Sequence, residues 1–133
     1  MNGSMFTVEM WDPRDKSGWK NDSSIPAMNE RRYLHSVSSM DDSIFVFGGW
    51  SDDNPCIKLC ESLDVRSDKW ESMKPMPLKR FEHSSIVIGD QILIVAGEPH
   101  TTQIDSYDPI TNTWTTLEHK LLQVRRSFQA FAL

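Results

Sequence analysis

MNERRYLHSVSSMDDSIFVFGG, residues 28–49, aligns without a gap to MPLKRFEHSSIVIGDQILIVAG, residues 76–97, at the fixed offset of 48 positions that separates their first residues. Self-similarity at a fixed offset is the signature of a repeat architecture. Identical residues occupy these pairs of positions: Met28 and Met76, Arg32 and Arg80, His35 and His83, Ser36 and Ser84, Asp42 and Asp90, Ile44 and Ile92, Gly49 and Gly97. The chain therefore repeats one structural unit of about 50 residues.

The second half of the unit recurs as well. CESLD (60–64) aligns with IDSYD (104–108), and each is followed at equal spacing by a tryptophan, Trp70 or Trp114. Partial copies stand at both ends of the chain. VEMWDP (8–13), followed by Trp19, repeats the second half with one inserted residue, and RRSF (125–128) begins the first half again, with Arg126 in the place of the repeated arginine.

Each complete unit predicts four antiparallel strands. Asp41-Asp42 and Gly89-Asp90 are turn sequences that tolerate a positive φ, and Asn112 can adopt the left-handed conformation in a tight turn before Trp114. The largely apolar second strands are expected to be covered on both faces. The first three strands of the two units are expected at 35–39, 43–47 and 58–65, and at 83–88, 91–95 and 103–107, with the two tryptophans on the outermost strands.

A glycine pair after an apolar strand, then an aromatic residue, then a tryptophan is the pattern by which this chain resembles the kelch family. Gly48, Gly49 and Trp70 carry the pattern in the first unit, and Tyr107 and Trp114 carry it in the second. The resemblance implies an all-β fold, a partial kelch β-propeller with two complete four-stranded blades and partial blades at both ends.

Two positions depart from the family pattern, since Ala96 replaces the first glycine of the second pair and Leu63 replaces the aromatic residue of the first unit. The resemblance still covers nearly the whole chain. We expect these divisions: a partial blade of outer strands at 6–24, kelch repeats at 25–73 and 74–117, and the start of a further repeat at 118–133.

The partial copies at the two ends cannot complete a third blade. With the strands of a blade named a to d from the innermost outward, the order along the chain is c-d, a-b-c-d, a-b-c-d, a. Strand b, which must lie between a and c, is missing from both ends. Since a kelch propeller has about six blades, we expect the chain to be a fragment of a longer kelch protein with strand edges left unpaired.

Composition narrows the classes of partner. The formal net charge is -5 and the isoelectric point is near 5.3, which argues against nucleic acid, because affinity for phosphates depends on lysine and arginine. No apolar run approaches the roughly 20 residues that cross a bilayer, so no membrane is expected. Cys56 and Cys60 stand four positions apart on an expected strand, too far for a disulfide. A reducing, cytoplasmic location fits best.

No catalytic motif, metal site or cofactor is expected. His35 and His83 recur with the repeat, which favours a structural position over a site, and His100 and His119 are expected to be solvated. The two cysteines lack the second ligand pair of a zinc site.

Aromatic residues and glycines at repeating positions are expected to build the blades. Trp19, Trp70, Trp114 and Tyr107 are expected in the blade core, and Gly48, Gly49 and Gly97 where backbones crowd. Trp50 differs, because it opens the loop between the second and third strands. It is either a hot spot for a partner or packing beneath the loop.

Arg32, Arg80 and Arg126 all stand where the chain enters an innermost strand. The kelch resemblance implies that this entry lies on a loop face where arginines grip acidic peptide segments through paired hydrogen bonds to carboxylates. The alternative is that each arginine braces its own loop.

The leading functional hypothesis, by resemblance, is a protein-interaction module from a kelch-like substrate-recognition adaptor of a cullin-based ubiquitin ligase. The cullin contact would be made by BTB and BACK domains, which are absent from this sequence. An actin or cytoskeletal role is the second interaction hypothesis. A kelch-propeller sugar enzyme, of the oxidase or the sialic-acid epimerase type, is the alternative from another class.

Overall fold

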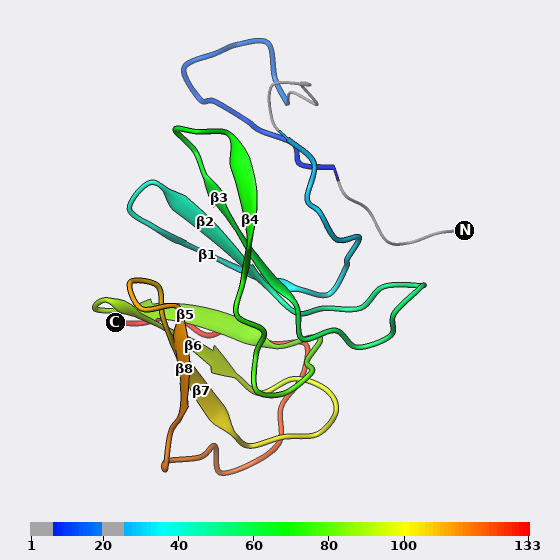
Figure 1. Ribbon diagram of the computed structural model, residues 1–133, viewed down its shortest axis with the longest axis vertical. Coiled ribbons are helices and arrows are strands. Elements are labelled where there is room, and N and C mark those ends of the chain that lie inside the picture. Colours follow the sequence, from blue (N-terminus) through cyan, green and yellow to red (C-terminus); the bar gives the residue numbers. More distant parts are fainter. Residues whose placement is uncertain (1–6, 20–25) are drawn as a thin grey trace.

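A computed structural model of the protein describes residues 7–19 and 26–133. The described part contains eight β-strands and no helix (Figure 1). The strands are β1 (Ser36–Met40), β2 (Ser43–Phe47), β3 (Cys60–Asp64), β4 (Lys69–Met73), β5 (Ser84–Ile88), β6 (Gln91–Val95), β7 (Ile104–Asp108) and β8 (Thr113–Thr116). Within the described residues, no helix could span a membrane.

The strands form two antiparallel sheets of four strands, in the orders β1-β2-β3-β4 and β5-β6-β7-β8. The register repeats with the sequence, since Ser36 pairs with Phe47 in the first sheet and Ser84 pairs with Val95 in the second. Each sheet is one blade, and in Figure 1 the blade β1–β4 lies above the blade β5–β8. This confirms the prediction of an all-β partial propeller with two complete four-stranded blades.

The turns between strands follow the expected backbone chemistry. Asp41 has a φ of 51° between β1 and β2, and Gly89 has a φ of 62° between β5 and β6. Asn112, before β8, has a φ of 51°. Aspartate, asparagine and glycine are the residues that enter this left-handed region most readily.

The hydrophobic core lies in the seam between the two blades. Phe47, on β2, packs edge-on against Tyr107 on β7 and Trp114 on β8, with ring centroids 6.0 and 5.9 Å apart. Phe45 also packs edge-on against Tyr107, at 6.3 Å. Strand β2 therefore buries its aromatic side chains against the next blade.

Two glycines are required where backbones crowd, Gly48 against the next blade and Gly97 against the entry segment of its own blade. A side chain at Gly48 would place its Cβ 2.5 Å from Met76 Cε and 2.6 Å from the carbonyl oxygen of Arg80. A Cβ at Gly97 would lie 2.7 Å from the carbonyl oxygen of Phe81. Both glycines have a positive φ, so a larger residue would be strained as well as crowded. This is the crowding that the repeated glycines predicted.

The partial blades at the two ends differ from the prediction. Residues 7–19 contain turns but none of the strands named above, and Trp19 is 70% exposed, so its assignment to a blade core was wrong. Residues 6 and 20–24 of the expected outer-strand segment lie outside the described residues. Residues 118–133 contain no strand either. A strand needs a hydrogen-bonded neighbour, and the neighbour that strand b would supply is missing at both ends.

Candidate functional site

The rim of the two blades, where the chain enters β1 and β5, holds the repeated arginines. Arg32 is 2% exposed. Its Nη1 donates to the carbonyl oxygens of Gly48 and Leu59 at 2.8 and 2.9 Å, and its Nη2 donates to Glu61 Oε2 at 2.8 Å. The guanidinium group thus ties the entry segment to the end of β2 and to β3.

Arg80 repeats this arrangement in the second blade. It is fully buried, and its Nη1 donates to the carbonyl oxygens of Ala96 and Gln103 at 2.7 and 3.1 Å. Its Nη2 donates to Asp105 Oδ2 at 2.6 Å. Gln103 Nε2 and the Thr116 hydroxyl donate to the other oxygen of Asp105, so the carboxylate is bonded on both sides.

The assignment of Arg32 and Arg80 to partner binding was therefore wrong, and the loop-bracing alternative describes their geometry. Both guanidinium groups have no exposed surface, and a buried ion pair that loses one member leaves an uncompensated charge. The sequence interpretation missed the partners Glu61 and Asp105. Their signal was an acidic residue that recurs at one position of the third strand.

The third arginine of the row is Arg125, whereas the sequence alignment had chosen Arg126. Gly49 N–H donates to the carbonyl oxygen of Arg80, and Gly97 N–H donates in the same way to that of Arg125, both at 2.8 Å. Adjacent arginines are interchangeable in an alignment, whereas backbone hydrogen bonds distinguish them.

A second set of backbone features gives the same register. Glu82 N–H donates to the carbonyl oxygen of Leu34, and Ser127 N–H donates to that of Glu82. These three residues have positive φ angles of 56°, 52° and 48°. Each lies two positions after the arginine of its repeat when Arg125 is the third arginine. Arg126 therefore corresponds to Phe81 and not to Arg80.

The first seam lies between the two blades, and a second seam lies where Gly97 of the second blade contacts Arg125 of the C-terminal segment. The rim carries different side chains over these two seams. Trp50 is half-buried and lies edge-on against Phe81, with ring centroids 5.0 Å apart. One repeat later the same positions are Glu98 and Arg126, whose charged groups approach to 3.4 Å. His100 Nδ1 lies 3.0 Å from the same carboxylate. Trp50 thus packs on a neighbour while part of it stays exposed, and Arg126 is an exposed rim residue.

The repeated histidines lie beneath the rim and are held neutral. Burial, with the nearby charge of Arg80, lowers the pKa of His83 to about 3. Burial and the charge of Arg32 lower the pKa of His35 to about 4. No cluster of three or more metal-ligating side chains occurs in the described part of the chain. His35 and His83 thus lie at equivalent positions of the two blades, near Arg32 and Arg80. A structural role for them stays a prediction.

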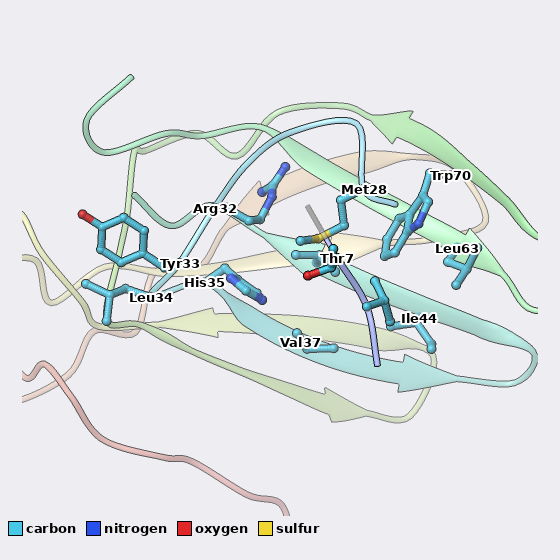
Figure 2. A pocket seen from close by; sticks show the side chains of 12 residues that line it. Thr7, Met28, Arg32, Tyr33, Leu34, His35, Val37, Ile44, Leu63 and Trp70 are labelled. Atoms are coloured by element: carbon cyan, nitrogen blue, oxygen red, sulfur yellow. The ribbon is translucent and has the colours of Figure 1, made fainter. Parts of the chain in front are cut away.

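The first blade has an apolar face with a cavity of about 420 Å³ (Figure 2). Its wall includes Met28, Ile44, Val46, Leu63 and Trp70. These residues occupy the repeat positions of seam residues in the second blade.

The tryptophans of the two blades make the same polar contact. Trp70 Nε1 donates to the carbonyl oxygen of Pro26, and Trp114 Nε1 donates to that of Lys74, each at 2.8 Å. Both tryptophans are partly buried at repeating positions. Trp114 packs against the core between the blades, whereas Trp70 lines the cavity on the first blade.

Comparisons with known proteins agree with the repeat and the fold described above. The Kelch motif family model matches residues 31–77. Kelch-like protein 40 from Xenopus tropicalis is 33% identical over 114 residues, which cover 84% of this chain and 18% of that protein. Kelch-like protein 36 from Bos taurus is 27% identical over 124 residues, covering 86% and 20%. Beta-scruin from Limulus polyphemus is 29% identical over 114 residues, covering 78% and 12%.

The chain spans about a fifth or less of the length of these relatives. The solved structure of YjhT shares the fold, with a TM-score of 0.72 at 19% identity, and the match covers 84% of this chain and 34% of that one. Repeat sequence, strand order, seam packing and relatives agree, and the chain belongs to the kelch-repeat proteins and forms consecutive blades of a β-propeller.

Proposed function

We propose that this chain is a protein-binding module whose contact surface is the rim over the two seams. The single observation that carries the proposal is the contrast between buried and exposed rim residues. Arg32 and Arg80 are buried in ion pairs within the blades. Trp50 and Arg126 keep exposed surface on the rim above them. A partly exposed tryptophan on a rigid neighbour is a typical interface anchor, and loops on a fixed frame carry specificity.

The chemistry of the rim favours a partner segment that combines an apolar side chain with an acidic one. The Trp50 and Phe81 pair offers aromatic surface. Arg126 offers a guanidinium group whose side chain is 66% exposed and which is only partly engaged by Glu98. An arginine of this kind binds carboxylates through paired hydrogen bonds.

The finer part of the proposal is that the module recognises substrates for a cullin-based ubiquitin ligase in the cytoplasm. The support is the similarity to Kelch-like proteins 36 and 40. The cullin would be contacted by domains that this chain does not contain. The chain itself would then bind the substrate and not the cullin.

The test is affinity capture with the full-length protein that contains this chain. Trp50→Ser and Arg126→Ala should each reduce capture of one partner at least tenfold, while each lowers the melting temperature only by the few degrees that about 1 kcal/mol of stability or less represents. Arg66→Ala is the matched control, because Arg66 is an exposed arginine in the turn between β3 and β4, away from the rim. A melting temperature that falls in step with capture would contradict a binding role.

The ligase assignment has its own readout. Cullin should be captured with the full-length protein and not with residues 1–133 alone, and the partner should accumulate in cells when the full-length protein is removed. Capture without cullin, together with an unchanged partner level, would reject the adaptor role and leave the binding module.

A cytoskeletal role is the second candidate, favoured by the similarity to Beta-scruin. Co-sedimentation of the full-length protein with actin filaments would distinguish it. The absence of enzymatic activity remains a prediction.

A further inference from the structure

A groove of about 400 Å³ lies between the two blades, on the side of the strand turns. Strand β1 starts near the rim with Ser36 and ends at Met40, which lines the groove, so the groove and the rim lie at opposite ends of the blades. Asp41 and Asp90, in the β1–β2 and β5–β6 turns, line it as well. Both turns lie at the left of Figure 1. The walls of the groove belong to the two complete blades, because every residue that lines it falls within 40–112.

The groove joins buried apolar side chains to exposed acidic ones. The buried side chains that line it are those of Phe45, Met73 and Tyr107. The charged side chains that line it are all acidic and exposed, and they belong to Asp41, Glu71 and Asp90. In the part of the chain that the structure describes, no ion pair engages these three carboxylates. Three carboxylates without a counter-charge give the groove a negative potential.

The first blade shows what a carboxylate at the position of Asp90 can pair with. Asp42 occupies that position in the first repeat, and it forms an ion pair with Arg66 of the β3–β4 turn. The residue that corresponds to Arg66 in the β7–β8 turn is Ile110. The two turns have the same backbone geometry, because the N–H of Arg66 and that of Ile110 each donate to the aspartate two positions earlier, at 2.8 Å. The second blade therefore has the carboxylate of this pair without the arginine.

Ile110 offers apolar surface where the first blade has its guanidinium group. Its side chain is 85% exposed and lines the same groove as Asp90. An arginine side chain matches both features, because its aliphatic stem packs on apolar surface while its charged end stays at the carboxylates. Arginine suits the site better than lysine, since its planar fork can bind more than one carboxylate oxygen at once.

We propose that this groove is a second docking site, whose occupant is an arginine side chain on an exposed segment of a protein partner. The guanidinium group takes the place that Arg66 holds in the first blade and pairs with Asp90. Asp41 and Glu71 complete its acidic surroundings, and the stem of the side chain packs on Ile110. The net charge of -5 favours the approach of such a segment. This goes beyond the proposed function, because the groove lies at the end of the blades away from the rim.

The test measures binding of short synthetic peptides to the full-length protein that contains this chain. Each peptide carries one arginine and one leucine, at varied separation, in a background of serine and glycine. A matched peptide has citrulline in place of arginine, which keeps the shape of the side chain and removes its charge. A subset of the arginine peptides should bind, and their citrulline counterparts should not. Asp90→Asn and Glu71→Gln should each weaken this binding by about fivefold.

Ile110→Arg tests the place of the missing arginine from within the chain. The variant supplies to Asp90 the guanidinium group that Arg66 supplies to Asp42, so it should abolish peptide binding. Because Ile110 is exposed, the melting temperature should change by less than about 2 °C. Peptide binding that persists in this variant would overturn the proposal.

Two matched controls separate the groove from the rest of the surface. Asp68→Asn removes one carboxylate outside the groove, at the position where the second blade has Asn112, and should change peptide binding by less than about twofold. Trp50→Ser, on the rim, should have as small an effect. An equal loss in Asp68→Asn would mean general electrostatic attraction, and a loss in Trp50→Ser would place the peptides on the rim. Either result would overturn the proposal, as would the absence of binding or equal binding of the citrulline peptides.

Discussion

The two seams of this molecule share one backbone and differ in the side chains above it. Over the first seam the rim positions are Trp50 and Phe81, an edge-on aromatic pair, and over the second they are Glu98 and Arg126, a charged pair. Beneath both, a glycine N–H donates to an arginine carbonyl oxygen at 2.8 Å. The comparison shows that the repeat conserves the parts that close a seam and leaves the rim above it free to vary.

Breaking a buried ion pair should give the largest loss of stability, far larger than breaking the exposed pair on the rim. Arg80→Ala leaves the Asp105 carboxylate buried without its partner and should cost about 3 to 5 kcal/mol of unfolding free energy. Arg126→Ala, at an exposed pair, should cost less than about 1 kcal/mol. Chemical denaturation of both variants measures the difference, and equal losses would contradict the division.

The seam core comes next. Trp114→Ala removes a ring that packs against Phe47 and Tyr107 and should cost about 3 kcal/mol. Trp19→Ala is the matched control, because Trp19 is 70% exposed, and it should change stability by less than about 0.5 kcal/mol. If the two tryptophans gave similar losses by thermal denaturation, the placement of the core in the seam would be wrong.

Acid should weaken the seam through its buried histidine. Burial lowers the pKa of His83 from 6.5 to about 3 in the folded chain, so the unfolded chain binds the proton more tightly. The contribution of neutral His83 to the free energy of unfolding is therefore fully present above about pH 6.5. It is lost as the pH falls from 6.5 towards 3, by about 2 kcal/mol between pH 6.5 and 5.

His83→Phe separates this effect from other acid-sensitive groups. Phe128 stands at the corresponding position of the third repeat, so a phenyl ring is native to that place in the repeat. Denaturation measured across pH 5 to 7 should show a flatter dependence in the variant. An unchanged slope would assign the acid sensitivity elsewhere.

The smallest effects should come from the rim itself. Trp50→Ser should cost about 1 kcal/mol, the value of an edge-on aromatic pair, and should not depend on salt. Glu98→Gln should cost less than about 1 kcal/mol, and the cost should shrink in high salt because the charged pair is partly exposed. Denaturation at low and high ionic strength checks both expectations, and a salt-dependent loss for Trp50→Ser would contradict the assignment.

Local sequence predicted the strands well and the arginine environment poorly. The apolar runs at 43–47 and 91–95 coincide with β2 and β6, because a strand covered on both faces needs only its own residues to be apolar. The burial of Arg80 depends on β7, which is distant in the sequence. Trp19 was misassigned for a related reason, since a repeat position becomes a core position only where a complete sheet forms around it.

The rate at which the Cys60 thiol is alkylated would report the opening of the first seam, between the two blades. Its thiol is 2% exposed within the core that joins the two blades, and burial raises its pKa to about 12. Because the thiol is buried and the thiolate is the reactive species, alkylating reagents should react with Cys60 only when this core opens. The rate of its labelling would therefore report how often this core opens, whether the blades separate or one of them unfolds.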